Sequence, residues 1–191
     1  DNLAIGYDAL GGSIDGGEYN VAIGNYSLDA NTSGDYNVAV GYDALTANTT
    51  GAYNTASGTQ SLYPNTTAHA NTAYGYNSLY ANTTGTRNIA IGYRAYDAAD
   101  TENDNLAIGY DALGGAIAGG EYNVAIGNYS LDALTTGDYN VAVGYDALTA
   151  NTTGNSNTAS GYQSLKSNTT GIRNTASGYK SLQANTTGDN N

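Results

Sequence analysis

Residues 37–53 read N-V-A-V-G-Y-D-A-L-T-A-N-T-T-G-A-Y and form one unit of a repeat that runs through the chain. The motif N-x-A-x-G recurs with its asparagine at positions 2, 20, 37, 54, 71, 88, 105, 123, 140, 157 and 174. The spacing is 17 residues, except after Asn2 and Asn105, where it is 18. A unit this short cannot bury its own apolar face, so successive units must stack on one another.

Numbered from its first asparagine, each repeat starts with a strand-like alternation. Position three is always Ala and position five always Gly, while positions two and four carry pairs such as Val21 and Ile23 or Thr55 and Ser57. The fixed Ala and Gly indicate a tight face and a close approach of the backbone. The pattern predicts an all-β fold, a parallel β-solenoid of about eleven 17-residue coils.

Position nine is the best candidate for the core. It is leucine in ten repeats and Tyr96 in the other; the leucines are Leu10, Leu28, Leu45, Leu62, Leu79, Leu113, Leu131, Leu148, Leu165 and Leu182. Because the chain has no Phe, Trp, Met or Cys, this core must be narrow.

The segment N-T-T-G has turn chemistry, with a glycine that tolerates positive φ. We expect it to be exposed, which makes its asparagines candidate glycosylation sites: Asn31, Asn48, Asn65, Asn82, Asn151, Asn168 and Asn185. The alternative is that Asn-Thr-Thr recurs only because it favours turns.

Stacking places equal positions in columns along the axis. Asparagines at position one are expected to exchange amide hydrogen bonds. Tyrosines at position six are expected to form a ring ladder or an adhesive surface: Tyr7, Tyr42, Tyr76, Tyr93, Tyr110, Tyr145, Tyr162 and Tyr179. Position seven is expected to face solvent, with no Asp directly above another Asp.

Six repeats form a larger unit, because the sequence restarts nearly verbatim after 103 residues. We interpret residues 1–191 as one repetitive solenoid with super-repeats 2–104 and 105–191, the second truncated. The 18-residue repeats carry glycine-rich loops at 11–17 and 114–120, which we interpret as irregular loops. Asn191 would begin a further repeat, so we expect a window of a longer array or a subunit that stacks end to end.

Composition argues against several function classes. The absence of cysteine excludes thiolate chemistry, and a net charge of −12 disfavours nucleic acid as a partner. No apolar run is long enough for membrane insertion. The single histidine, His69, has no partner histidine or cysteine and is expected to be structural. We expect no cofactor, no metal site and no catalytic residue.

The remaining motifs are weak signals. Asp8, Asp43, Asp111 and Asp146 recur in Y-D-A-L, but without a calcium-loop pattern we interpret them as solubilising residues rather than calcium ligands or an acid/base pair. The glycine-rich loops lack the Lys-Ser/Thr of a phosphate loop. Threonines at position two are too few and too interrupted for an ice-binding array.

N-V-A-I-G at 20–24 and 123–127 and N-I-A-I-G at 88–92 resemble the repeats in the heads of trimeric autotransporter adhesins. The whole chain is also similar to N-T-A-I-G-Y/N-T-T-G arrays of bacteriophage tail fibres and other large surface proteins. The resemblance implies a left-handed, commonly trimeric β-roll that serves cell-surface attachment. The 17-residue period and the tyrosine enrichment depart from the usual adhesin-head repeat.

Together these patterns predict a non-enzymatic structural segment of an extracellular fibre or filament, at a cell surface or on a virion. Its main partner would be itself, as a homotrimer or through end-to-end stacking. The alternative is a receptor-binding head or shaft of a phage fibre or bacterial adhesin that contacts cell-surface glycans.

Overall fold

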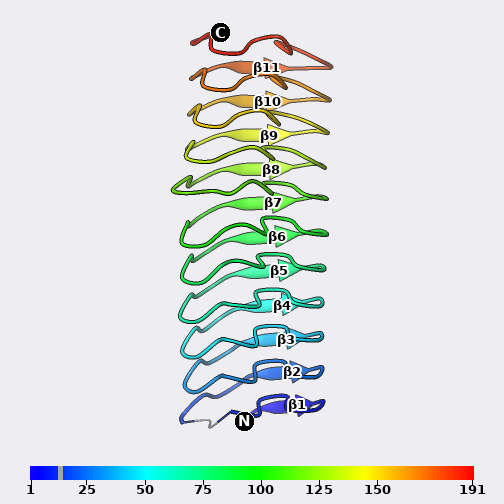
Figure 1. Cartoon of the computed structure of the whole chain (residues 1–191), viewed down its shortest axis with the longest axis vertical. Helices are drawn as coiled ribbons and strands as arrows, with labels where there is room; N and C mark the ends of the chain where they lie inside the picture. The colour runs from blue at the N-terminus through cyan, green and yellow to red at the C-terminus, as the bar shows by residue number, and fades with distance from the viewer. Residues whose placement is uncertain (13–14) are drawn as a thin grey trace.

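The chain folds into a single solenoid whose coils stack along one axis (Figure 1). The computed structural model describes residues 1–12 and 15–191; Ser13 and Ile14, in the first glycine-rich loop, lie outside the described residues. The strands form one eleven-stranded sheet in sequence order, and each strand is parallel to the next. The predicted parallel β-solenoid is therefore confirmed.

Every strand is three residues long and occupies positions two to four of its repeat. The strands are β1 (Leu3–Ile5), β2 (Val21–Ile23), β3 (Val38–Val40), β4 (Thr55–Ser57), β5 (Thr72–Tyr74), β6 (Ile89–Ile91), β7 (Leu106–Ile108), β8 (Val124–Ile126), β9 (Val141–Val143), β10 (Thr158–Ser160) and β11 (Thr175–Ser177). We call each stretch from a position-one asparagine to the residue before the next one a coil. Over the described residues, no helix is long and apolar enough to cross a membrane.

The strands pair in register, alanine on alanine, as in Ala22 opposite Ala39. The alanine side chains point into the coil and are buried in β2–β11, whereas their neighbours at positions two and four face outward. The glycine that follows each strand has a positive φ, 130° at Gly24, and a Cβ there would lie 2.4 Å from the carbonyl oxygen of Gly41. The close backbone approach expected for this glycine is therefore present, and its positive φ is a second reason for glycine here.

The position-nine column forms the core as predicted. Its leucines are buried in coils one to ten, and Tyr96 is fully buried in the same column. Leu182 of coil eleven is 39% exposed. Alanines of the strands complete this narrow core.

Among the described residues, three non-glycine positions in each coil adopt left-handed backbone conformations, which the sequence did not predict. In coil three these are Asp43, Leu45 and Tyr53, with φ of 56°, 52° and 62°. A left-handed residue costs about 1–2 kcal/mol, while burying a leucine side chain contributes about 1.5–3 kcal/mol. Burial therefore outweighs the strain at position nine, and the chain can turn sharply without glycine.

The expectation for the N-T-T-G glycine was wrong. Gly34 and Gly51 do not have positive φ; the left-handed residue comes two positions later, at Tyr36 and Tyr53. Glycine is needed here for space, because a Cβ on Gly34 would lie 2.2 Å from the carbonyl oxygen of Gly51.

Candidate functional site

The first asparagine column, at position one, connects every coil to the next. The backbone N–H of Asn37 donates to Oδ1 of Asn20 at 2.8 Å, and Nδ2 of Asn37 donates to the carbonyl of Gly51 at 2.8 Å. Nδ2 of Asn37 also lies 3.1 Å from Oδ1 of Asn20. The predicted exchange between side chains is present, but the shorter bond is the one that satisfies a buried backbone N–H.

The second asparagine column is formed by position twelve, inside the N-T-T-G turn. Nδ2 of Asn48 donates to Oδ1 of Asn31 at 2.8 Å and to the carbonyl of Gly51 at 3.0 Å. The turn therefore folds its asparagine inward, where the amide completes the same hydrogen-bond network as the first column.

This inward turn shows that the expected exposure of the candidate glycosylation sites was wrong. Nδ2, the atom that would carry a sugar, is engaged in hydrogen bonds in the buried column of Asn31, Asn48, Asn65, Asn82, Asn151 and Asn168. Asn185 is partly exposed, but its Nδ2 donates to Oδ1 of Asn168 at 3.0 Å. The folded solenoid does not present these amides for modification.

The first tyrosine column, at position six, is exposed along the solenoid. Its members are Tyr7, Tyr42, Tyr76, Tyr93, Tyr110, Tyr145, Tyr162 and Tyr179. Rings in consecutive coils stack, with centroids 5.1 Å apart for Tyr76–Tyr93 and 5.3 Å apart for Tyr93–Tyr110. The predicted ring ladder is confirmed, although Thr59 interrupts it in coil four.

In coils two and eight, which lack tyrosine at position six, a tyrosine at position seven continues the ladder. Where position six is asparagine, Tyr26 and Tyr129 at position seven insert edge-on between the rings above and below. The asparagines then bond to the backbone: Oδ1 of Asn128 accepts the N–H of Tyr110 at 3.0 Å.

Sequence reasoning missed a second tyrosine column, formed by the last residue of a coil (position seventeen, or eighteen in the 18-residue coils). Tyr36 stacks between Tyr19 and Tyr53, with centroids 5.0 and 5.2 Å away, and Tyr122 stacks on Tyr139 at 5.1 Å. The signal was available, because the last residue is tyrosine in five repeats.

Coils six to eight, residues 88–139, form a junction where the second asparagine column stops. Ala99, Ile117 and Leu134 lie buried there instead. In coil six, the phenol oxygen of Tyr96 accepts a hydrogen bond from Nδ2 of Asn105 at 2.6 Å. Burial, reinforced by the charge of Glu102, raises the pKa of Tyr96 strongly, so this phenol stays neutral.

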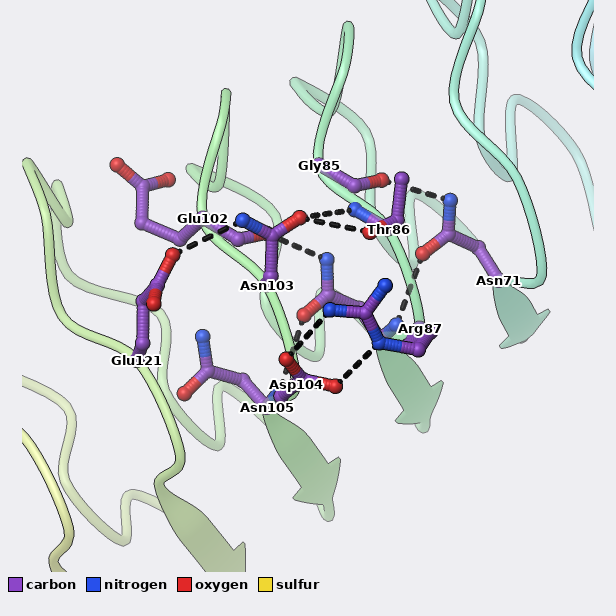
Figure 2. Close-up of polar contacts among 10 residues, drawn as sticks. Asn71, Gly85, Thr86, Arg87, Glu102, Asn103, Asp104, Asn105 and Glu121 are labelled. Atoms are coloured by element: carbon purple, nitrogen blue, oxygen red, sulfur yellow. Dashed lines mark hydrogen bonds and ion pairs between the residues drawn. The ribbon is translucent and has the colours of Figure 1, made fainter.

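In the turns of the junction, side-chain oxygens accept hydrogen bonds from backbone N–H groups (Figure 2). Oδ1 of Asn103 accepts the N–H of Thr86 at 2.8 Å, and Nδ2 of Asn103 donates to Glu121 at 2.9 Å. The buried carboxylate of Glu102 accepts the N–H groups of Asp100 and Thr101 at 3.1 Å. A third N–H donor, from Gly119 of the next coil, lies 3.0 Å from Oε1 of Glu102.

An exposed ion pair flanks this network. Nε of Arg87 lies 2.6 Å from Oδ1 of Asp104. The hydrogen bond from Arg87 lowers the pKa of Asp104. An exposed pair of this kind contributes little to stability, so we assign it no functional role.

The carboxylates behave differently from the expectation for position seven. Asp146 is buried and pairs with Lys166 at 2.6 Å, so position seven does not uniformly face solvent. Asp132, at position ten, lies near Asp111 at position seven and Asp97 at position ten. Burial first, and then the charges of these two carboxylates, raise the pKa of Asp132. The pKa of Asp29 is also raised, by burial first and then by the charges of Asp8 and Asp43.

His69 has a structural role, as expected. Its Nδ1 accepts the backbone N–H of Ala52 at 2.9 Å. Asp35 and Asp138, at the same position in other coils, accept the N–H groups of Glu18 and Glu121 in the same way.

The described part of the chain contains no group of three or more His, Asp or Glu side chains placed to hold a metal ion, and its surface has no pocket. What it offers instead is a set of regular columns: two of asparagine inside and two of tyrosine outside. Comparison with protein-family models, curated proteins and solved structures finds nothing that matches this chain.

Proposed function

We propose that this chain is a rigid structural segment of an extracellular fibre or filament and has no catalytic role. The observation that carries the proposal is the first asparagine column, whose hydrogen bonds join coil to coil from Asn2 to Asn191. Because each coil bonds only to its neighbours, the array gains length without changing its cross-section.

The extracellular location rests on the resemblance of the N-x-A-I-G repeats to those of surface fibres. Antibody labelling of intact cells or virions that carry the protein tests it. Labelling that appears only after lysis would contradict it.

The rod itself is testable by small-angle scattering. Eleven coils at about 4.8 Å each give a length of roughly 50 Å. Two copies of residues 2–190 joined in tandem should scatter as a particle about twice as long with an unchanged cross-section. A compact or bent particle, or turnover of a polysaccharide by the soluble chain, would refute the proposal.

Self-association is part of this proposal. The outer face of the sheet exposes apolar side chains in several coils, among them Ile89 and Ile91 of coil six at 40% and 38% exposure and Val143 of coil nine at 38%. A homotrimer that shares this face would remove them from water. Mass measurement in solution should give three chains; a monomer mass would exclude the trimer.

Glycan binding is the second candidate function, and the exposed tyrosine columns favour it. Stacked rings cover each other's faces, so Tyr93 and its neighbours offer mainly ring edges and hydroxyls to a sugar. We therefore expect hydrogen-bonded recognition, tested by a glycan array with the purified chain. A Tyr93→Phe variant that binds as well as the parent would exclude the hydroxyl of this ring from recognition.

A further inference from the structure

The longest continuous ring contact in the molecule runs from coil five to coil eleven. We call it the long tyrosine run; its members are Tyr76, Tyr93, Tyr110, Tyr129, Tyr145, Tyr162 and Tyr179. Neighbouring centroids lie between 5.1 Å, for Tyr76–Tyr93, and 5.9 Å, for Tyr129–Tyr145. The core and the asparagine columns hold the coils together without these rings.

The phenols of this run combine accessibility with mutual contact. Tyr76, Tyr93 and Tyr110 are 43%, 47% and 39% exposed, so solutes reach them. Each also has another phenol against it. Reacting groups that are already held side by side react far faster than the same groups in free solution.

We propose that the long tyrosine run is a site of oxidative cross-linking, where one-electron oxidants join tyrosines of neighbouring coils through their ortho carbons. Each of two neighbouring phenols gives one electron to the oxidant and one proton to water. The two tyrosyl radicals then form one carbon–carbon bond, and each ring regains its aromaticity as its ortho hydrogen moves to oxygen. Two equivalents of a one-electron oxidant are reduced for each bond formed.

The structure predicts which tyrosines remain outside this chemistry. Tyr96 is fully buried and out of reach of the oxidant. Tyr74 is 62% exposed, more than Tyr93, but contacts no other aromatic ring among the described residues. Exposure alone would favour Tyr74, whereas contact between rings favours Tyr93. The reaction would link neighbouring coils covalently and so stiffen the rod. Its chemistry does not depend on the proposed fibre role.

Trypsin makes the test specific, because Arg87, Arg94, Arg173 and Lys180 isolate two members of the run. Peptide 88–94 contains only Tyr93, and peptide 174–180 contains only Tyr179. The dilute chain is oxidised with a photoexcited ruthenium complex and persulfate. The monomer is then isolated, unfolded, digested and analysed by mass spectrometry.

We expect peptide 88–94 to be joined to peptide 1–87 or 95–166, and peptide 174–180 to peptide 95–166. Tyr162→Phe keeps a stacking ring but removes the phenol from the one ring that Tyr179 contacts among the described residues, so the joined form of peptide 174–180 should be lost. The matched control, Tyr74→Phe, should leave both joined species unchanged. Circular dichroism checks that both variants fold.

Three results would overturn the proposal. Tyr93 and Tyr179 could be recovered unjoined from monomer that has lost tyrosine elsewhere. The joined peptides could form equally in the chain oxidised in urea, where no ladder exists. Peptide 174–180 could stay joined in Tyr162→Phe.

Discussion

Coils nine and ten, residues 140–173, carry both asparagine columns, whereas the junction of coils six to eight carries only the first. In the junction the second column is replaced by Ala99, Ile117 and Leu134, yet the strands there keep the same register. The carbonyl that both columns share stays satisfied, as at Glu102, whose carbonyl accepts Nδ2 of Asn88 at 2.7 Å.

The difference teaches that the two columns are not equivalent. Oδ1 of a first-column asparagine accepts a buried backbone N–H, a donor that has no other partner in the described part of the chain. Loss of a second-column asparagine leaves behind only side-chain atoms, such as Oδ1 of Asn82, which has no hydrogen-bond partner among the described residues. A buried backbone donor left without a partner is the more costly defect.

The largest expected effect comes from Asn140→Ala in the first column. The substitution leaves the N–H of Asn157 without its acceptor, which lies 3.0 Å away, and removes the 2.8 Å bond to Gly154. We expect a loss of about 3 kcal/mol in the free energy of unfolding. Urea unfolding measures it, and a loss no larger than that of Asn151→Ala would refute the ranking of the columns.

The next effect concerns the residue that fills the junction. Tyr96→Leu should cost about 2 kcal/mol, because it opens a cavity and removes one of the two acceptors of Nδ2 of Asn105. Adding Ala99→Asn restores the pattern of the regular coils, and the new amide can donate to Oδ1 of Asn82. A double-mutant cycle should give a favourable coupling of roughly 1 kcal/mol; additive losses would contradict it.

A smaller effect is expected for Asn151→Ala in the second column. Gly154 keeps the bond from Asn140, and Asn168 keeps its bond to Gly171 at 3.0 Å, so no backbone group is left unpaired. The expected loss is about 1 kcal/mol in the same urea experiment. A loss near that of Asn140→Ala would show that the second column is as essential as the first.

The smallest effect is a change in pH dependence within the junction. Burial and nearby carboxylates raise the pKa of Asp132 above its ordinary 3.8 in the folded state. The folded chain therefore binds this proton more tightly than the unfolded chain, and stability falls as the pH rises from about 3.8 through the raised pKa.

Asp132→Asn removes this titration, so urea unfolding should give a higher midpoint than the parent at neutral pH and a smaller difference under acid. Asp29→Asn, outside the junction, should change in the same direction because its pKa is also raised. A lower neutral-pH midpoint for Asp132→Asn would show that the carboxylate forms a stabilising contact.

Much of the architecture was predictable because it follows from periodicity. The invariant Ala and Gly and the alternation around them place the strand, and the leucine column places the core. The tyrosine ladder at position six follows from the same argument. The second tyrosine column was missed although its period is visible, because tyrosine ends only five of the repeats, whereas it occupies position six in eight.

What the sequence by itself determined is the parallel stacking, its register and the identity of the columns, because a 17-residue period leaves no other way to bury the apolar positions. The tertiary structure decided which side of each column faces inward. Asn48 lies inside a turn that reads as exposed, because left-handed residues at positions seven, nine and seventeen fold the coil back on itself. A period fixes which residues stack, but the direction of a side chain depends on the backbone angles. Leucine and tyrosine rarely adopt positive φ, so their left-handed conformations could not be predicted from the sequence.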